Sequence, residues 1–345
     1  MSLLNRVSSL VTVVALASLC GCAGTTISNI DAFKPEPLEK ASVMPSDESL
    51  SGGKSKVVVF EFDEGGNVVA QESHLGLSMA GNIEAVITEK QGTELVDRKA
   101  AEKLQQEIAL SEMNKGGSYE GPRIADYAIS GSITNAGFNK RFNEATQSVN
   151  KKTGQVYRTA PSFRYTADFA GTLKVYELPS MKVVKTLSLK DNKSRTEETR
   201  SSSTYTERDD ELVRGAGADA VKAMRIELQN FFAKKGYILD KRAAENTRIF
   251  QVSLGTEDGV AQGDTCDVFT YKEFKNNITG KVQYEKVKLC EAKVTNLVAN
   301  NTAWLAIPNE ESLKIRLGDE VKVRYSKNFM DAMKSTGSML NSLAK

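Results

Sequence analysis

Residues 56–67 read KVVVFEFDEGGN, a run of β-branched and aromatic residues that ends in an acidic, glycine-containing turn. Such a run is typical of a buried strand in a parallel or mixed sheet. In the segment that follows, about residues 73–90, the apolar side chains recur on one face of a helix. We therefore expect a folded domain that begins at Lys56 with a strand and a helix packed on it.

The same alternation of strand and helix patterns continues along the chain. The patterns predict, in order, a second strand, a second helix, a third strand, a hairpin around Pro179-Ser180 and a longer helix, at residues 93–98, 101–115, 125–138, 163–189 and 209–235. The order β-α-β-α-β-β-β-α indicates an α/β sandwich with a mixed sheet over residues 56–242.

A second domain is expected at residues 247–326. Its short apolar runs are separated by Gly, Asn and Asp, which is typical of a small all-β barrel or sandwich of about five strands. It contains Cys266 and Cys290, which could form a disulfide in an oxidising compartment or remain two buried free thiols. The last residues, 327–345, are expected to form a short amphipathic helix.

The N-terminus has the features of an exported protein. An apolar run too short to cross a membrane follows Arg6, which is typical of a signal peptide over residues 1–21. Leu19-Cys20-Gly21-Cys22 resembles the bacterial lipobox. The resemblance implies acylation of Cys22, with palmitate among the acyl chains, and Ala23 after it implies sorting to the outer membrane. An ordinary signal peptide, leaving a soluble periplasmic protein, is the alternative.

Residues 22–55 are expected to form a flexible linker, because they combine three prolines with polar residues and little periodicity. No apolar run of transmembrane length follows Cys22. The chain has 46 Lys and Arg against 44 Asp and Glu, a formal net charge of +2. Matched charges of this kind do not indicate a nucleic-acid partner.

Three stretches, KVVVFEFDEGGN, ELVDRKAAEKLQQEIALSE and IADYAISGSIT, resemble successive motifs of the CsgG-type lipoprotein family, whose relatives include the N-terminal domain of TolB. The Gly-Asp pairs at 263–264 and 318–319 resemble the C-terminal module of FlgT-type proteins. The resemblance implies a CsgG/TolB N-terminal-like α/β domain, a periplasm-facing position at the outer membrane and a C-terminal assembly or docking module.

The residues that could carry catalysis do not form a recognisable set. His74 is the one histidine, at the expected start of a helix, and the two mature cysteines lack the spacing of a zinc site. Gly53-Lys54-Ser55 precedes a strand where a phosphate-binding loop would follow one, and Gly215-Ala216-Gly217 is better explained by helix packing. Asp63 and Glu64 are expected to be solvated. We expect no enzyme, no cofactor and no metal.

In the secretion channel of the CsgG type, two hairpins of each subunit enter the membrane and the subunits form a ring. The corresponding residues here, 139–159 and 190–208, are polar and do not alternate as membrane strands require. They are expected to be hydrated hairpins or flexible loops. We therefore expect a non-catalytic scaffold or assembly factor of a secretion, flagellar or cell-wall machine, with protein partners and homo-oligomer formation left open. A secretion pore subunit and a ligand-binding envelope receptor are the alternatives.

Overall fold

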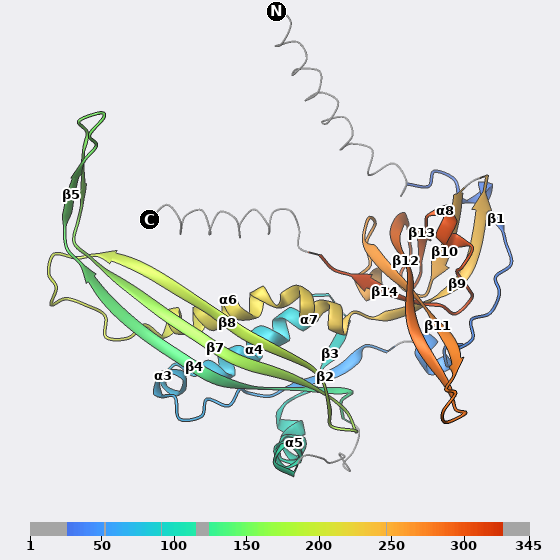
Figure 1. Cartoon of the computed structure of the whole chain (residues 1–345), viewed down its shortest axis with the longest axis horizontal. Helices are drawn as coiled ribbons and strands as arrows, with labels where there is room; N and C mark the ends of the chain where they lie inside the picture. Colours follow the sequence, from blue (N-terminus) through green and yellow to red (C-terminus); the bar gives the residue numbers. More distant parts are fainter. Residues whose placement is uncertain (1–25, 52, 91, 115–123, 246, 327–345) are drawn as a thin grey trace, which may run out of the picture. The chain divides into compact units, whose positions relative to one another are not determined.

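The computed structural model describes residues 26–326 except 52, 91, 115–123 and 246. The expected signal peptide, Cys22 and the expected C-terminal helix lie outside the described residues. The described chain forms two compact units (Figure 1). The α/β unit is Lys54–Phe232, and the β unit combines residues up to Gly53 with those from Ala233. Across the described ranges, no helix has both the length and the apolar character needed to span a membrane.

The α/β unit is built on a five-stranded mixed sheet with the order β3-β2-β4-β7-β8. Its strand β2 (Ser55–Val59), which lies between β3 and β4, is the apolar run that opens the domain. It is flanked in parallel by β3 (Thr93–Leu95) and β4 (Tyr127–Asn143). β7 (Ser162–Glu177) and β8 (Lys182–Glu198) continue the sheet in antiparallel fashion. The predicted mixed α/β architecture is confirmed.

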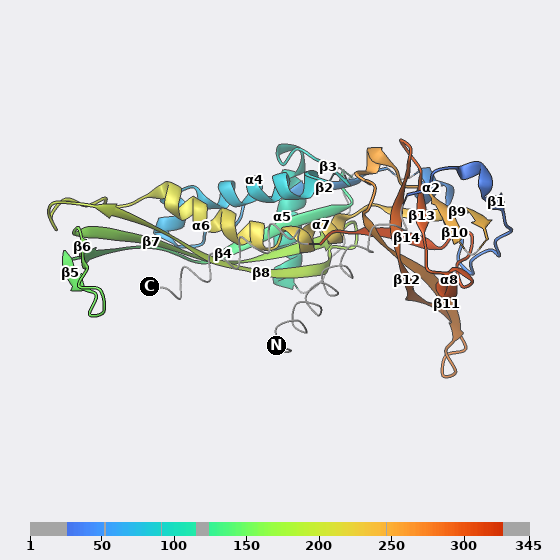
Figure 2. The same ribbon diagram turned by 90° about the horizontal axis from the view of Figure 1, so that it is seen from above.

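Helices cover both faces of this sheet. They are α3 (Val68–Glu72), α4 (Leu75–Thr88), α5 (Glu102–Asn114), α6 (Asp210–Ala223) and α7 (Arg225–Phe232). Figure 2 shows α4 and α6 running along one side of the long strands. Val57 and Val59 are buried in the core formed with α4, α6 and α7, whereas Val58 is buried in the core formed with α5. The opening strand is continuously apolar because both of its faces are covered.

The end of the α/β unit differs from the prediction. The single helix expected over 209–235 is two helices, because the backbone N–H of Met224 turns back to the carbonyl groups of Val221 and Lys222. The unit ends at Phe232 rather than at residue 242, because the following residues form a strand of the β unit. Gly236 in that strand lies so close to Leu254 that an added Cβ would approach its side chain to 2.4 Å. A contact between residues this far apart produces no periodic pattern in the sequence, so the sequence did not predict this boundary.

The β unit contains a seven-stranded antiparallel sheet with the order β1-β9-β10-β13-β12-β11-β14. Its strands are β1 (Lys34–Pro35), β9 (Lys235–Ala244), β10 (Thr247–Val252), β11 (Thr265–Lys275), β12 (Val282–Val298), β13 (Ala303–Ala306) and β14 (Glu320–Arg324). β9 also pairs with β14 over three residues. The unit is rich in β-structure, as predicted, but the strand order and the pairing of β9 with β14 were not predicted.

The segment predicted as a flexible linker, residues 22–55, is in large part packed onto the β unit. Both backbone polar groups of Ile27 bond to the side chain of Asn296. β1 then pairs with β9, and the N–H of Ala41 donates to the carbonyl of Leu317 at 2.9 Å. The proline-containing backbone is extended, as expected. An extended segment of this kind can add to the free edge of a sheet, and a proline is tolerated in such an edge strand.

The two exposed hairpins share one turn sequence, Asn-x-x-Thr-Gly. In the α/β unit it joins β5 (Thr146–Val149) to β6 (Val156–Thr159), and in the β unit it joins β11 to β12. Asn150 and Asn276 each accept bonds from two backbone N–H groups of the turn through the side-chain oxygen. The glycine of each turn has a positive φ, 72° and 66°. The same residues therefore build the same turn twice, as an Asx-type bond and a left-handed glycine allow.

Candidate functional site

Strands β4, β7 and β8 form a long antiparallel sheet whose two faces differ in chemistry. The inner face carries the apolar residues that pack on α4, α6 and α7. The other face, called here the open face, is polar along its length except for Gly137 and Ala170. From the pairing register its polar residues are Ser130, Ser132, Asn135, Asn139, Arg141, Asn143, Ser162, Arg164, Thr166, Asp168, Thr172, Lys174, Thr186, Ser188, Lys190, Asn192, Ser194, Thr196 and Glu198. A sheet with one apolar and one hydrated face is typical of antiparallel strands.

The far end of the open face carries two arginine side chains. Arg141 and Arg164 lie directly opposite each other in the register of β4 and β7. Arg164 donates to the hydroxyl of Ser194 at 3.4 Å, and neither arginine forms an ion pair with an acid among the described residues. Like charges directly opposite each other destabilise a sheet. An anionic group bound here would relieve that repulsion.

The inner face at the same end is closed by aromatic side chains. Phe142 and Phe163 have ring centroids 5.1 Å apart, and the ring of Tyr165 stacks on Phe163 at 5.9 Å. Phe138 stacks on the other side of Tyr165, also at 5.9 Å. This aromatic ladder packs β4 against β7 at their far ends.

Residues 199–209, called here the strap, cross this aromatic ladder. Tyr205 lies edge-on to Phe163 with centroids 5.7 Å apart, and the ammonium of Lys140 lies 3.5 Å from the centre of the Tyr205 ring. The N–H of Thr206 donates to the hydroxyl of Tyr165 at 2.9 Å. The second predicted polar segment, 190–208, is therefore a continuation of β8 followed by an ordered strap.

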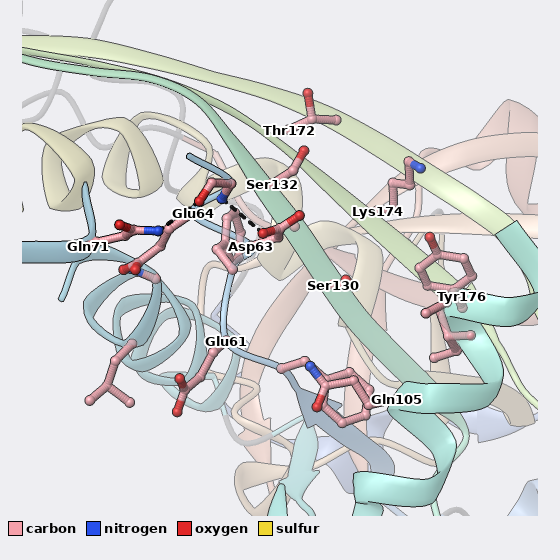
Figure 3. A pocket seen from close by; sticks show the side chains of 18 of the residues that line it. Glu61, Asp63, Glu64, Gln71, Gln105, Ser130, Ser132, Thr172, Lys174 and Tyr176 are labelled. Carbon is pink, nitrogen blue, oxygen red and sulfur yellow. Dashed lines mark hydrogen bonds between the residues drawn. The ribbon is translucent and has the colours of Figure 1, made fainter. Parts of the chain in front are cut away.

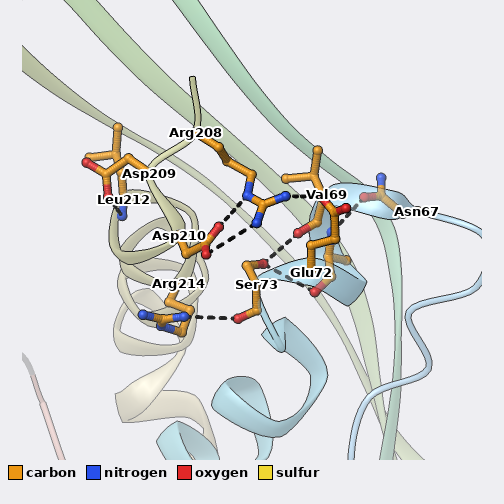
Figure 4. A network of polar contacts seen from close by, with 10 residues as sticks. Asn67, Val69, Glu72, Ser73, Arg208, Asp209, Asp210, Leu212 and Arg214 are labelled. Carbon is orange, nitrogen blue, oxygen red and sulfur yellow. Dashed lines mark hydrogen bonds and ion pairs between the residues drawn. The ribbon is translucent and has the colours of Figure 1, made fainter. Parts of the chain in front are cut away.

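The base of the strap is joined to α3 and α6 by polar contacts (Figure 4). Arg208 forms ion pairs with Asp210 at 2.6 Å and with Glu72. Asp209 caps α6 by accepting from the N–H of Leu212 at 2.9 Å. Arg214 donates to the carbonyl of Ser73 at 3.2 Å. The strap thus begins and ends on fixed elements.

A cavity of about 670 Å³ lies within the α/β unit, beside the carboxyl end of β2. Figure 3 shows its polar lining, with Ser130, Ser132, Thr172 and Lys174 on the sheet and Gln105 on α5. The chain passes from β2 through α4 to β3 on one face, then through α5 to β4 on the other. In open α/β sheets, the crevice beyond such a reversal of direction is where ligands bind. The cavity was not predicted, because its walls come from segments far apart in the sequence.

The acidic turn after β2 forms one wall of this cavity. Glu64 accepts from the N–H of Gly76 at 2.7 Å, and Asp63 accepts from the N–H of Gly65 at 2.9 Å. Gly76 and Gly131 are required here, since an added Cβ would meet the Phe62 carbonyl or ring at 2.3 and 2.2 Å. The two carboxylates that were expected to be solvated therefore accept backbone N–H groups and stabilise the turn and the start of α4.

His74 also lines the cavity and is exposed, in a left-handed conformation just before α4. Among the described residues, no group of three or more His, Cys, Asp or Glu side chains has the arrangement of a metal site. Gly217 of the glycine pair on α6 would, with a Cβ, approach the sulfur of Met79 to 2.7 Å. Close packing of α6 on α4 explains this glycine, as expected.

Cys266 and Cys290 are free and buried in the core of the β unit. Cys266 lies opposite Ala292, whereas Cys290 lies opposite Val268, so the two are not a direct cross-strand pair. The second of the two predicted alternatives, a pair of buried thiols, describes this structure. Burial raises the pKa of both thiols to about 12. Since the thiolate is the reactive form, neither cysteine is suited to nucleophilic chemistry at neutral pH.

An exposed ion cluster joins β11, β12 and β14. The two carboxylate oxygens of Glu291 accept from the Arg324 guanidinium at 2.5 and 2.6 Å, and Lys288 donates at 2.9 Å. Arg324 and then Lys288 lower the pKa of the Glu291 carboxyl to about 2. The cluster ties together strands that are distant in sequence.

Comparison with known proteins assigns the chain to no family. No family model matches it, and no curated protein matches it. Among solved structures, a minor lipoprotein from Acinetobacter baumannii is 10% identical, with 51% of this chain and 92% of that chain covered, at a TM-score of 0.25. The lipoprotein GNA1162 from Neisseria meningitidis is 11% identical, with coverage of 51% and 99% and a TM-score of 0.24. The PelC dodecamer from Paraburkholderia phytofirmans is 12% identical, with coverage of 54% and 96% and a TM-score of 0.22. At TM-scores this low, these likenesses carry no conclusion about fold or function.

Proposed function

We propose that the protein is a non-catalytic lipoprotein of the bacterial outer membrane, anchored through Cys22 and facing the periplasm, that acts as a scaffold or assembly factor of a cell-envelope machine. The open face of β4, β7 and β8 carries this proposal. It is long, hydrated and already ordered, so a partner would meet it without a large loss of conformational entropy.

The charge of the open face supports a protein partner with acidic groups. Arg141 and Arg164 lie opposite each other on the two strands, and neither forms an ion pair with an acid among the described residues. Charge complementarity of this kind raises association rates and selects partners more than it raises affinity. The resemblance of the opening motifs to CsgG-type lipoproteins supports an envelope machine without choosing among secretion, flagellar and cell-wall assemblies.

A pore made from the far ends of these strands is the weaker candidate. A membrane strand needs one apolar face, but the open face is polar, and on the inner face β8 presents Lys193 and Arg195. These cations pair with Asp219 and Asp209 at 2.9 and 3.1 Å. Each Lys or Arg facing lipid at mid-bilayer costs about 2–4 kcal/mol.

The test is extraction of the native protein from purified outer membranes in mild detergent, beside a Cys22→Ala variant. We expect a monomer or small complex without conductance in planar bilayers, and release of the variant as a soluble periplasmic protein. A large ring that conducts ions would overturn the scaffold proposal in favour of the pore. Membrane retention of the variant would overturn the lipid anchor.

A ligand-binding envelope receptor is a second candidate, favoured by the polar cavity beside β2. A cavity of about 670 Å³ is of the size that small-molecule sites have. Native mass spectrometry of the purified protein tests it. A bound molecule present in the wild type and lost from a Ser132→Trp variant that retains its thermal stability would favour the receptor. A wild-type spectrum that contains only the unliganded mass would count against it.

A further inference from the structure

The described chain begins on the β unit within a few residues of the expected lipid. Ile27 is 9% exposed and forms a small apolar cluster with Ile249 and Trp304. Its N–H donates to the side-chain oxygen of Asn296 at 2.6 Å, and its carbonyl accepts from the side-chain amide at 3.0 Å. One asparagine therefore satisfies both backbone groups of Ile27 and fixes this point of the chain.

The residues that follow continue the attachment. Residues 27–41 are called here the clamp. Within it, the carboxylate of Glu36 pairs with Lys241 at 2.7 Å and with Arg248 at 3.5 Å. At the end of the clamp, the backbone of Glu39 and Ala41 bonds to Leu317. The clamp therefore crosses the unit from β12 to the start of β14. An attachment at several separate points cannot be released by a fluctuation at one of them.

Covalent geometry then limits how far the β unit can lie from the lipid on Cys22. Five peptide units join Cys22 to Ile27, and fully extended they span at most about 18 Å. Had the whole of residues 22–55 been a free linker, the reach would have been more than about 100 Å. The inference rests on the lipid anchor of the proposed function, and on the clamp for its geometry.

We propose that the clamp holds one end of the β unit, the end that carries Asn296, against the bilayer surface, and that the β11–β12 hairpin points away from it into the periplasm. β12 runs from Val282 to Val298, so Asn296 and the hairpin turn lie at its opposite ends. The 14 residue-to-residue steps from Val282 to Asn296 span about 46 Å if the strand is straight. Figure 1 shows the N-terminal segment beginning at the upper edge of this unit and the hairpin turn at its lower end.

The chemistry of the hairpin turn suits such a position as an exposed contact point. Ile278 at its apex is 96% exposed, and Phe274 and Tyr284 on the two strands are 46% and 50% exposed. The side chain of Asn276 bonds to the N–H groups of Ile278 and Thr279 and so holds the apex in place. The clamp thus determines which end of the unit is available to a periplasmic partner.

The test uses the full-length lipidated protein, reconstituted into vesicles of phosphatidylethanolamine and phosphatidylglycerol that contain a fluorescent acceptor lipid. A donor dye is placed on Ala32→Cys, an exposed position in the clamp, or on Asn277→Cys in the hairpin turn. We expect strong loss of donor fluorescence at position 32 and little at position 277. Two further variants serve as controls. Insertion of a Gly/Ser linker of about 20 residues after Thr25 leaves the clamp intact but lengthens the tether. Ile27→Ser combined with Asn296→Ala removes the first point of attachment.

The outcomes test the clamp geometry and the lipid anchor separately. Strong energy transfer at 32, little at 277, loss of that difference in the linker variant and a smaller difference in the clamp variant support the inference. Equal transfer at both positions in a protein that floats with the vesicles overturns the clamp geometry and leaves the lipid anchor standing. A protein that does not float with the vesicles overturns the lipid anchor, and the inference falls with it.

Discussion

Replacing Tyr205 by Ala should release the strap from the end of the sheet. The ring lies edge-on to Phe163 at 5.7 Å and beneath the ammonium of Lys140 at 3.5 Å. An aromatic pair contributes about 0.5–1.5 kcal/mol and an exposed cation–π contact about 0.5–1 kcal/mol. The ring is 42% exposed, so we expect the free energy of opening the strap to fall by about 1–2 kcal/mol.

Hydrogen exchange of the strap amides measures this change locally. The N–H of Thr206, which donates to the hydroxyl of Tyr165 at 2.9 Å, should exchange about 5 to 30 times faster, as a loss of one to two kcal/mol implies. A Tyr205→Phe variant keeps the ring and both ring contacts and loses only the polar contacts of the hydroxyl with Lys140 and Glu207, so its exchange should rise less than that of the alanine variant. Unchanged exchange in the alanine variant, or equal acceleration in both variants, would refute the reasoning.

Three further predictions concern the packing, the thiols and the ion cluster. Gly131→Ala should lower the free energy of unfolding by about 1–3 kcal/mol, because the new Cβ would overlap the Phe62 ring. Urea unfolding measures the loss, and adding Phe62→Leu should recover part of it. Cys266 and Cys290 should resist a thiol reagent at pH 8 in the native protein and both react in urea; absence of thiol in urea would contradict this. The folded pKa of Glu291, about 2, is below its ordinary value of 4.5, so the stability it contributes is complete above that value and is lost as pH falls through the folded pKa. A Glu291→Gln variant should lose less stability than the wild type between pH 4.5 and pH 2, and an identical loss in both would count against the ion cluster.

Much of the α/β unit could be predicted because its signals are local. The run VVVF predicts a strand buried on both faces, and the 3.6-residue periodicity of Leu75, Met79 and Ile83 predicts a helix. Both appear in the structure as β2 and α4, with those three side chains fully buried. Polar hairpins were also expected, because a strand that faces water on both sides carries polar residues throughout.

The candidate sites depend on contacts that no local pattern records. The polar cavity combines Glu64, Gln105 and Lys174, which come from a turn, a helix and a strand. The strap lies ordered on the sheet because Tyr205 meets Phe163 and Lys140, residues more than forty positions away. Composition alone predicted a hydrated hairpin or flexible loop here, because the serines, threonines and charged residues of the strap show no periodicity.

The N-terminal segment shows most clearly which features the sequence predicts and which features the tertiary structure decides. Its composition predicts that residues 22–55 have no core of their own, because prolines and polar residues bury little apolar surface. Whether an extended segment is free or attached is decided by the rest of the fold. Here the free edge of β9 and the side chain of Asn296 accept it. By itself the sequence determined the elements and their periodicity, which are set by each residue and its neighbours. Tertiary structure alone decided the pairing of distant strands, the position of the strap and the attachment of the clamp, because those depend on which unsatisfied edges and side chains the folded chain brings together.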